Sequence, residues 1–309
     1  MIRAQATIRP QAAGRGGQWM SMNRMLVLAA VLFCALRPAP CALAQEQAPL
    51  RPLPMGDTLL NLPSNQIAAH GQWDMKFTHR FNQSLSQGSF SDQLHSLFGL
   101  DTNADVVFGF AYAIRPDMQL SLVRSNTNDT LEAAAKYVLW QQTAGRPMNV
   151  TLRGGADFRT ERELDDRTSL FAQAIVTRQF GRKGEIFFLP TFATNAGRAV
   201  TGDTSGALFE HAFNVPVAFA WMLRPGFAAV LELTPPNSDL GDDLKGDFAW
   251  AAGVKRNIGG HWFEILLTNS QATLVDQYVS STFQGTPLDA GDVHLGFNIE
   301  RRFGKRRSQ

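Results

Sequence analysis

Two stretches combine acidic side chains with serine and histidine, the residue types of a hydrolase site: Asp92, His95, Ser96 and Asp101 in the first, and Asp203, Ser205, Glu210 and His211 in the second. Acyl transfer requires a nucleophile, a base and an orienting group within hydrogen-bond distance of one another. Neither stretch carries a local signature such as the Gly-x-Ser-x-Gly turn that exposes a catalytic serine. We therefore interpret both as solvated loop residues and predict that the protein is not an enzyme, with a hydrolase as the most distant alternative.

Candidate metal ligands are similarly unspecific. One loop supplies enough carboxylate oxygens for a calcium ion, from Asp239, Asp242, Asp243 and Asp247. Their spacing does not match the Asp-x-Asp-x-Asp-Gly pattern of a preformed calcium loop. Both cysteines, Cys34 and Cys41, fall in an N-terminal segment that we expect to be removed, so no thiolate site remains. We predict no cofactor and no metal site, and the sequence does not decide whether the 239–247 loop binds calcium.

A third set of residues is charged and regularly spaced within apolar runs. On an extended strand, residues two apart share one face, so acids and bases at such positions can form ion pairs. The candidates for these pairs are Arg80, Asp101, Glu132, Lys136, Arg153, Asp157, Glu232, Lys255 and Glu264. Their role depends on which way the strands that carry them face.

The elements that position these charges follow from the hydrophobic pattern. Between Ala104 and Trp140, apolar residues recur at every second position in three runs, separated by polar breaks at 115–117 and 127–129. A period of two is typical of strands, and short polar breaks indicate hairpins. The pattern continues in nine further runs: 70–81, 148–160, 168–180, 185–194, 208–223, 227–234, 247–256, 261–269 and 292–303. The sequence therefore predicts about twelve antiparallel strands.

The connections between these strands alternate in length. Tight ones are expected at 115–117, 143–147, 181–184, 224–226 and 257–260. Longer ones are expected at 82–103, 161–167, 195–206, 235–246 and 270–291, and only 127–129 breaks the rule. Short turns at one rim and long loops at the other are typical of outer-membrane barrels. We predict an all-β fold, a twelve-stranded up-and-down transmembrane barrel, whose even strand number places both termini on the short-turn, periplasmic side.

The face assignment places charge inside the barrel. With the apolar face toward lipid, seven acids and six bases point inward: Asp74, Lys76, Arg80, Glu132, Lys136, Arg153, Asp157, Glu232, Asp247, Lys255, Glu264, Glu300 and Arg302. This near balance fits mutual pairing. We also expect Arg80 to pair with Asp101 and to hold the first long connection in the lumen. A soluble β-domain would reverse the two faces.

The N-terminal region is typical of a secreted protein. Arg24 precedes an apolar run at 25–36 and an Ala-x-Ala site ending at Ala44, which predicts a signal peptide at 1–44. Residues 1–21 fall outside the protein if translation starts at a later methionine. We assign 45–69 as a Pro-rich periplasmic lead-in, 70–303 as the barrel and 304–309 as a basic periplasmic tail. Removing the signal takes five basic residues and leaves 24 basic against 27 acidic residues, which argues against nucleic acid as a partner.

Several short motifs resemble a known family. They are His79-Arg80-Phe81, Phe98-Gly99-Leu100-Asp101, Tyr112, Arg124-Ser125 and Lys136-Tyr137. These residues resemble a family of secreted bacterial β-barrel proteins with no assigned function, over most of the chain from about Leu59 to Phe303. The resemblance implies an outer-membrane-type barrel and supplies no activity. The chain departs from outer-membrane barrels in that a basic tail follows Phe303, and in using Phe more than Tyr.

Two classes of function follow from these expectations. The first is a closed or narrowly gated barrel that passes a small polar solute. The second is a non-transporting scaffold or surface-binding barrel whose lumen is filled by ion pairs. The balance of inward charge slightly favours a closed lumen. As partners we expect outer-membrane lipid and the outer-membrane insertion machinery, and we expect a monomer in the outer membrane with both termini in the periplasm.

Overall fold

The computed structural model describes residues 53–143, 145–160, 167–197, 199–201, 204–206, 208–237, 246–284 and 286–305. The predicted signal at 1–44 lies outside these residues, and the predicted tail is described only at 304 and 305. Most of the described chain is β-strand. Among the described helices, none has the length and apolar character needed to cross a membrane.

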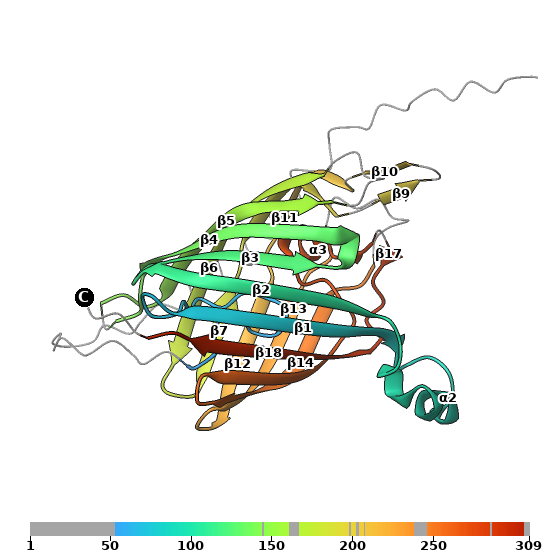
Figure 1. The fold of residues 1–309 in the computed structure, drawn as a ribbon, viewed down its shortest axis with the longest axis horizontal. Coiled ribbons are helices and arrows are strands. Elements are labelled where there is room, and N and C mark those ends of the chain that lie inside the picture. Colours follow the sequence, from blue (N-terminus) through green and yellow to red (C-terminus); the bar gives the residue numbers. More distant parts are fainter. Residues whose placement is uncertain are drawn as a thin grey trace, which may run out of the picture. The chain divides into compact units, whose positions relative to one another are not determined.

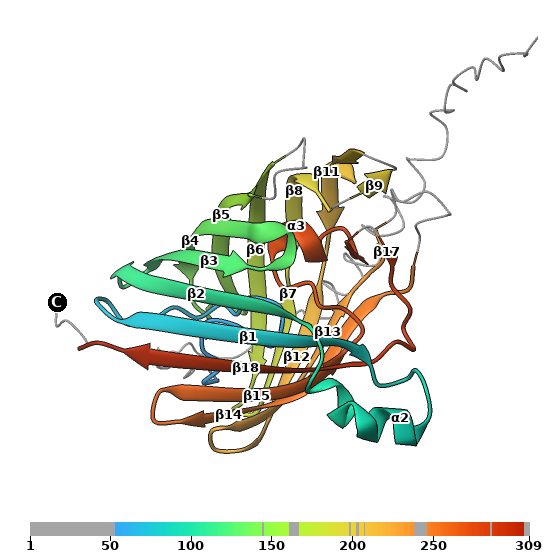
Figure 2. The same ribbon diagram turned by 45° about the vertical axis from the view of Figure 1, so that its right-hand side comes forward.

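The strands form one sheet that closes on itself (Figures 1 and 2). Each pairs antiparallel with its neighbours, and the first strand pairs with the last, Trp73 opposite Phe303. The strands of this sheet are β1 Trp73–Ser84, β2 Ala104–Arg115, β3 Met118–Ser125, β4 Thr130–Trp140, β5 Asn149–Arg159, β6 Thr168–Phe180, β7 Gly184–Phe188, β8 Thr191–Ala196, β11 Phe209–Asn214, β12 Val217–Arg224, β13 Phe227–Thr234, β14 Ala249–Ile258, β15 His261–Thr268 and β18 His294–Phe303. Because β7 continues into β8 and β11 into β12, the wall is crossed twelve times, and the predicted twelve-stranded barrel is confirmed.

Proline causes the two interruptions in the wall. Pro190 separates β7 from β8, and Pro216 separates β11 from β12. Proline has no N–H to donate to a strand ladder, so each crossing breaks into two pieces. The carbonyls of both prolines still accept hydrogen bonds: that of Pro190 from the N–H of Ala174 at 3.0 Å, and that of Pro216 from the N–H of Leu189 at 2.9 Å. The wall therefore stays continuous at this level.

The connections segregate by length as the sequence indicates, with two exceptions: 141–148 is long for its rim and 126–129 is short for the other. One rim carries the residues between strands at 116–117, 141–148, 181–183, 225–226 and 259–260. The other rim carries 85–103, 126–129, 160–167, 197–208, 235–248 and 269–293. At the turn between β14 and β15, Gly259 (φ 56°) and Gly260 (φ 84°) both adopt positive φ, as a two-residue type I′ hairpin requires.

Small elements occur in the connections of the long-loop rim. Helix α2 (Phe90–His95) and the 3₁₀ turn η1 (Leu97–Gly99) follow β1, and the short turn η2 (Thr127–Asp129) joins β3 to β4. A hairpin of β9 (Ala199–Thr201) and β10 (Thr204–Gly206) follows β8. The connection from β15 to β18 contains α3 (Val275–Tyr278), β16 (Thr282–Phe283) and β17 (Thr286–Pro287).

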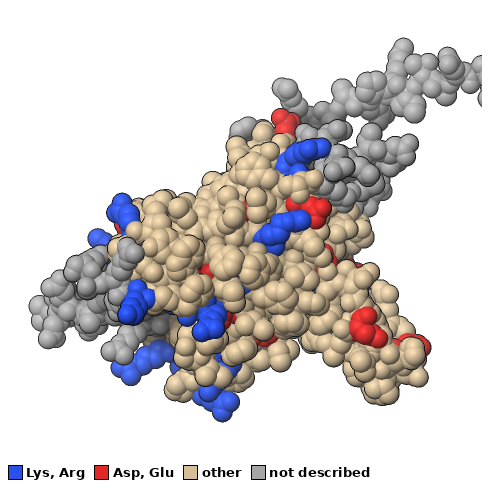
Figure 3. Space-filling view, in the orientation of Figure 1, with Lys and Arg blue, Asp and Glu red and all other residues tan. Residues whose placement is uncertain are grey.

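The two faces of the wall are inverted relative to a soluble barrel. Along β15, Ile265 is 63% exposed on the outside, whereas its neighbour Glu264 is 1% exposed on the inside. Large apolar side chains such as Phe110, Leu170 and Phe219 are exposed around the barrel. Figure 3 accordingly shows a wall surface that is mostly uncharged. Apolar residues outside and charged residues inside are expected where the surroundings are lipid.

Two segments fill the barrel interior. We call residues 53–69 the strap; Met55, Leu59 and Leu62 within it are almost fully buried. The strap leads directly into β1 at the short-turn rim. We call residues 269–284 the inserted loop; it belongs to the long-loop rim, and all four residues of α3 are buried. The strap differs from our expectation of a periplasmic lead-in over 45–69, because its described part packs inside the lumen.

Candidate functional site in the barrel lumen

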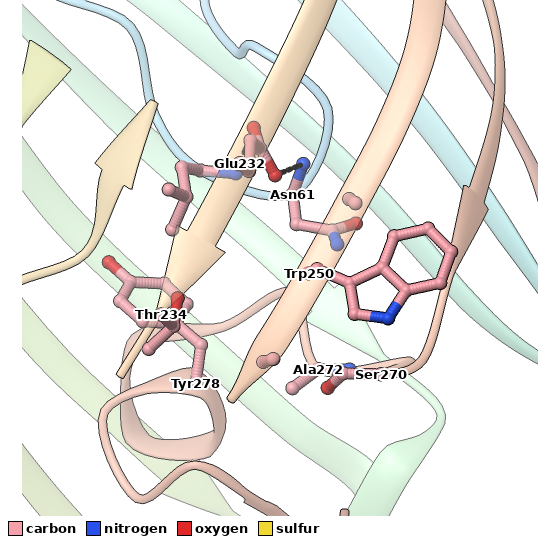
Figure 4. A pocket seen from close by; sticks show the side chains of 10 residues that line it. Asn61, Glu232, Thr234, Trp250, Ser270, Ala272 and Tyr278 are labelled. Carbon is pink, nitrogen blue, oxygen red and sulfur yellow. Dashed lines mark hydrogen bonds between the residues drawn. The ribbon is translucent and has the colours of Figure 1, made fainter. Parts of the chain in front are cut away.

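Glu232 is the wall residue that holds the backbone of the strap most directly. It points inward from β13 and is buried. Its carboxylate accepts the N–H groups of Leu60 at 2.7 Å, of Asn61 at 2.9 Å (Figure 4) and of Leu62 at 3.1 Å. These three donors would otherwise lack partners inside the barrel, where Leu60 and Leu62 are buried. One acidic side chain thus fixes a three-residue turn of the strap.

Two lysines hold neighbouring groups of the strap. Lys255 donates to the carbonyl of Thr58 at 2.5 Å and forms an ion pair with Glu264, also at 2.5 Å. Lys136 forms an ion pair of 2.7 Å with Asp57. Burial by itself raises the pKa of the Asp57 carboxyl, but the charges of Lys136 and Lys76 and the hydrogen bonds from Lys136 and Gln119 together outweigh this effect and hold the pKa well below its usual range. The strap is therefore bound through both its backbone and an ionised side chain.

Arg80 also binds the strap, whereas we expected it to pair with Asp101. Its guanidinium donates to Asn61 Oδ1 at 2.7 and 3.0 Å, to the carbonyl of Leu60 at 3.2 Å and to Asn298 Oδ1 at 2.8 Å. Asp101 is exposed in the connection between β1 and β2. The structure does not bring Arg80 and Asp101 together, because Arg80 points into the lumen and the connection packs on the other face of β1.

A further ion pair lies within the wall. Arg153 of β5 contacts the carboxylate of Glu132 on β4, and both side chains are largely buried. The guanidinium of Arg153 also lies 4.8 Å from the centre of the Phe171 ring, a distance suited to a cation–π interaction. The pair is thus enclosed by other side chains, where water screens its charges little.

Residues of β5 and β6 hold the inserted loop. Arg159 forms an ion pair of 2.9 Å with Asp276, whose N–H donates to Asp157 at 3.2 Å. Burial raises the pKa of the Asp276 carboxyl even though the charge of Arg159 opposes this effect. Gln173 donates to the hydroxyl of Tyr278 at 2.7 Å. Charged and polar wall residues thus bind α3 in the same way that others bind the strap.

The remaining contacts of the strap are apolar. Its leucines belong to a buried cluster with large wall residues, among them Ile175 and Phe187. Several inward positions around them are alanine: Ala193, Ala212, Ala218, Ala220, Ala228 and Ala251. Small side chains at these positions leave room for the strap. The lumen therefore has a charged side that binds polar groups and an apolar side that packs against leucines.

The strap and the inserted loop meet around two small cavities. Asn61 and Tyr278 line both of them, and Glu232 lines the first while Lys136 lines the second. Each cavity has a volume of about 20 Å³, which is room for one water molecule. Figure 4 shows Tyr278 and Asn61 on either side of the first cavity. Among the described residues, these two cavities are far too small to hold a solute larger than water.

Several residues of this site do not appear among the sequence candidates. Asp57, Asn61, Arg159, Asp276 and Tyr278 contribute through segments that we expected outside the lumen, or at the end of a strand. Arg159 lies an even number of residues after Arg153 on the same predicted strand, so the alternation of that strand predicts that both point inward. The others lie in segments with no period of two, and no signal of that kind could have found them.

The remaining candidates lie apart from the lumen. Asp92 caps α2 by accepting from Ser89, and Glu210 and His211 are exposed, with 3.8 Å between Glu210 Oε1 and His211 Nε2. Asp203 and the acidic residues at 239–243 lie outside the described residues, as does the side chain of Ser205. Within the described part of the chain, no group of three or more histidine, cysteine or acidic residues is arranged to hold a metal.

Comparisons with known proteins give a family and a set of structural neighbours. Residues 56–303 match the family described as membrane bound beta barrel domain (DUF5777). No curated protein matches the chain by sequence.

The solved structures with a similar fold include the following three proteins. A NanC porin is 8% identical, with a TM-score of 0.46, and the match covers 75% of this chain and 100% of the porin. An outer membrane channel from Pseudomonas putida F1 is 10% identical, with a TM-score of 0.43 and coverage of 77% and 97%. The outer membrane protein Omp33 of Acinetobacter baumannii is 10% identical, with a TM-score of 0.42 and coverage of 76% and 99%. These likenesses concern the fold.

Proposed function

Because this chain belongs to the family of membrane-bound β-barrel domains, we propose that it is an outer-membrane channel that its own strap keeps closed. When the strap moves, the barrel admits a small polar solute. The observation that carries this proposal is the binding of the strap by Glu232, Lys136, Lys255 and Arg80, which together occupy the charged side of the lumen.

The way in which the strap is held supports its movement. Its one described bridge, between Thr58 and Pro63, is internal to the strap. Its described contacts with the wall are side-chain hydrogen bonds, ion pairs and apolar packing, and they include no strand pairing. Withdrawal of the strap would therefore leave the closed ladder from β1 to β18 intact. A plug that is separate from the wall can open a lumen without unfolding the barrel.

The groups that the strap would vacate favour a polar solute. Glu232 binds amide N–H groups, Lys255 and Arg80 bind carbonyls, and Lys136 binds a carboxylate. A solute with amide, carbonyl or carboxylate groups could make the same hydrogen bonds. Such an exchange lowers the cost of leaving these wall residues without partners.

The proposal includes an orientation in the membrane and a set of partners. We place the short-turn rim and both termini in the periplasm, so the strap enters from that side. Pairing of β1 with β18 leaves no free edge in the described wall, which favours a monomer surrounded by lipid and inserted by the outer-membrane machinery. Labelling of a tag in the 181–183 turn on intact cells would contradict this orientation.

Single-channel conductance tests the proposal. The intact protein in planar bilayers should stay closed most of the time, whereas a variant lacking residues 53–66 should conduct steadily. If the deletion does not refold, Leu60→Asp with Leu62→Asp should give the same result, because carboxylates would disfavour the apolar side of the lumen. A folded variant whose strap has left the lumen but which does not conduct would contradict the proposal.

The inserted loop favours a second candidate function. It enters the lumen from the opposite rim and is held by Arg159 and Gln173. A barrel filled from both ends could serve as a non-transporting scaffold. The absence of conductance after displacement of both the strap and the inserted loop would support that alternative.

A further inference from the structure

Helix α2 and the turn η1 have the reverse of the usual amphipathic arrangement. The four large apolar residues of these elements and Leu100, which follows η1, are all exposed: Phe90 (75%), Leu94 (53%), Leu97 (54%), Phe98 (39%) and Leu100 (55%). The buried side chain of α2 is Gln93, which donates to the carbonyl of Ser84 at 2.8 Å. Short helices of soluble proteins bury apolar side chains and expose amides. The exposed apolar surface therefore indicates surroundings other than water.

The segment packs on the outer, lipid-facing side of the wall. Phe81 has the same parity as the outward residues of β1, yet it is only 4% exposed. Gly99 of η1 lies beside it, since a side chain at Gly99 would meet the Cβ atoms of Gln83 and Phe81 at 3.2 and 3.7 Å. Figures 1 and 2 show α2 outside the barrel, beyond the end of β1. The exposed surface of α2 and η1 thus continues the apolar belt of the barrel at the long-loop rim.

Two of these exposed side chains belong to residues with a strained backbone. Leu97 (φ 50°) and Phe98 (φ 56°) are consecutive residues in the left-handed region, which costs free energy for any residue with a Cβ atom. Such strain persists where the surroundings compensate for it. Burial of two large apolar side chains in a bilayer would supply that compensation.

The charge of the segment limits what can cover it. The connection at 85–103 has the acids Asp92 and Asp101 and no lysine or arginine. Attraction to anionic lipid headgroups therefore cannot hold it to the membrane, and apolar burial must. We propose that α2 and η1 form an interfacial anchor, with the five apolar side chains inserted among the acyl chains of the membrane leaflet at the long-loop rim.

Depth-dependent fluorescence quenching tests this anchor. Cys34 and Cys41 are the two cysteines of the full sequence, so replacing both by serine gives a cysteine-free background. Leu94→Cys and the control Asp101→Cys would each be labelled with an environment-sensitive dye, because both positions are exposed. The full-length variants would be refolded into phosphatidylcholine vesicles, with and without phosphatidylglycerol, whose acyl chains carry bromine.

The dye at position 94 should show blue-shifted emission and be quenched by the acyl-chain bromines, equally in both lipid mixtures. The dye at position 101 should show neither effect. Water-like, unquenched emission at 94 would overturn the anchor. So would a dye at 94 that is shielded without quenching, or whose emission depends on the protein-to-lipid ratio, since either result would assign the surface to a protein partner or a second copy.

Discussion

At the scale of single residues, the ion pairs of the lumen have an energetic consequence that surface pairs do not. Glu132 is almost fully buried, and Arg153 is its cationic partner. Removing one member of a buried pair leaves the other charge without compensation in a poorly screened interior. The pair formed by Arg115 and Asp117 on the short-turn rim provides a natural comparison, because those side chains are 61% and 33% exposed.

We expect Arg153→Ala to lower the free energy of unfolding by about 3–5 kcal/mol. The control Arg115→Ala should cost less than about 1 kcal/mol, because water screens an exposed pair. Reversible denaturant unfolding of the protein refolded into lipid vesicles would measure both values. Equal small losses for the two variants would mean that the lumen is wet and that its charges are screened.

Among the charged residues, sequence reasoning identified the inward face but not all the partners. The parity of Glu132 and Arg153 on neighbouring predicted strands is enough to place them on one face. The pairing of Lys136 with Asp57 could not be foreseen in the same way, because Asp57 lies in a segment without strand periodicity. Arg80 shows the same difficulty, since its partner Asn61 is identified only when the path of the strap is known.

At the scale of elements, the strands were predictable because each one is in contact with lipid on one side. Contact with lipid requires apolar residues at every second position, and the sequence of each strand shows this alternation by itself. The strap follows no such rule: its contacts with Glu232 join residues about 170 positions apart in the chain. The sequence shows the leucines of the strap, but it does not show that they pack against the apolar side of the lumen.

The lipid-facing side of a strand should tolerate charge only near its ends. Phe110 lies near the middle of β2 on the outer face, and Phe180 ends β6 at the short-turn rim. We expect Phe110→Arg to cost about 2–4 kcal/mol if it reaches the bilayer midplane, and Phe180→Arg about 0–1 kcal/mol near the interface. Unfolding titrations in vesicles would give the difference, and equal costs at the two positions would contradict the placement of the membrane along the barrel.

At the scale of the whole molecule, the barrel is closed in two independent ways. Pairing of β1 with β18 closes the wall, and the strap and the inserted loop fill the interior from opposite rims. The first closure gives the barrel its stability in lipid, because no backbone edge is left unpaired in the described wall. The second determines whether the barrel can conduct. The central claim is therefore that residues 53–69 lie within the lumen and are bound by its charged wall.

Amide hydrogen exchange of the intact protein in a bilayer tests this claim most directly. The N–H groups of Leu60, Asn61 and Leu62 donate to Glu232, and that of Ala68 donates to Gln119. Peptides covering 53–69 should therefore exchange as slowly as peptides from the barrel strands. Glu232→Ala should accelerate exchange in the strap while β1 stays protected, and the exposed control Glu210→Ala should change neither. Exchange of the strap at the rate of an unstructured chain in the unmodified protein would contradict the account.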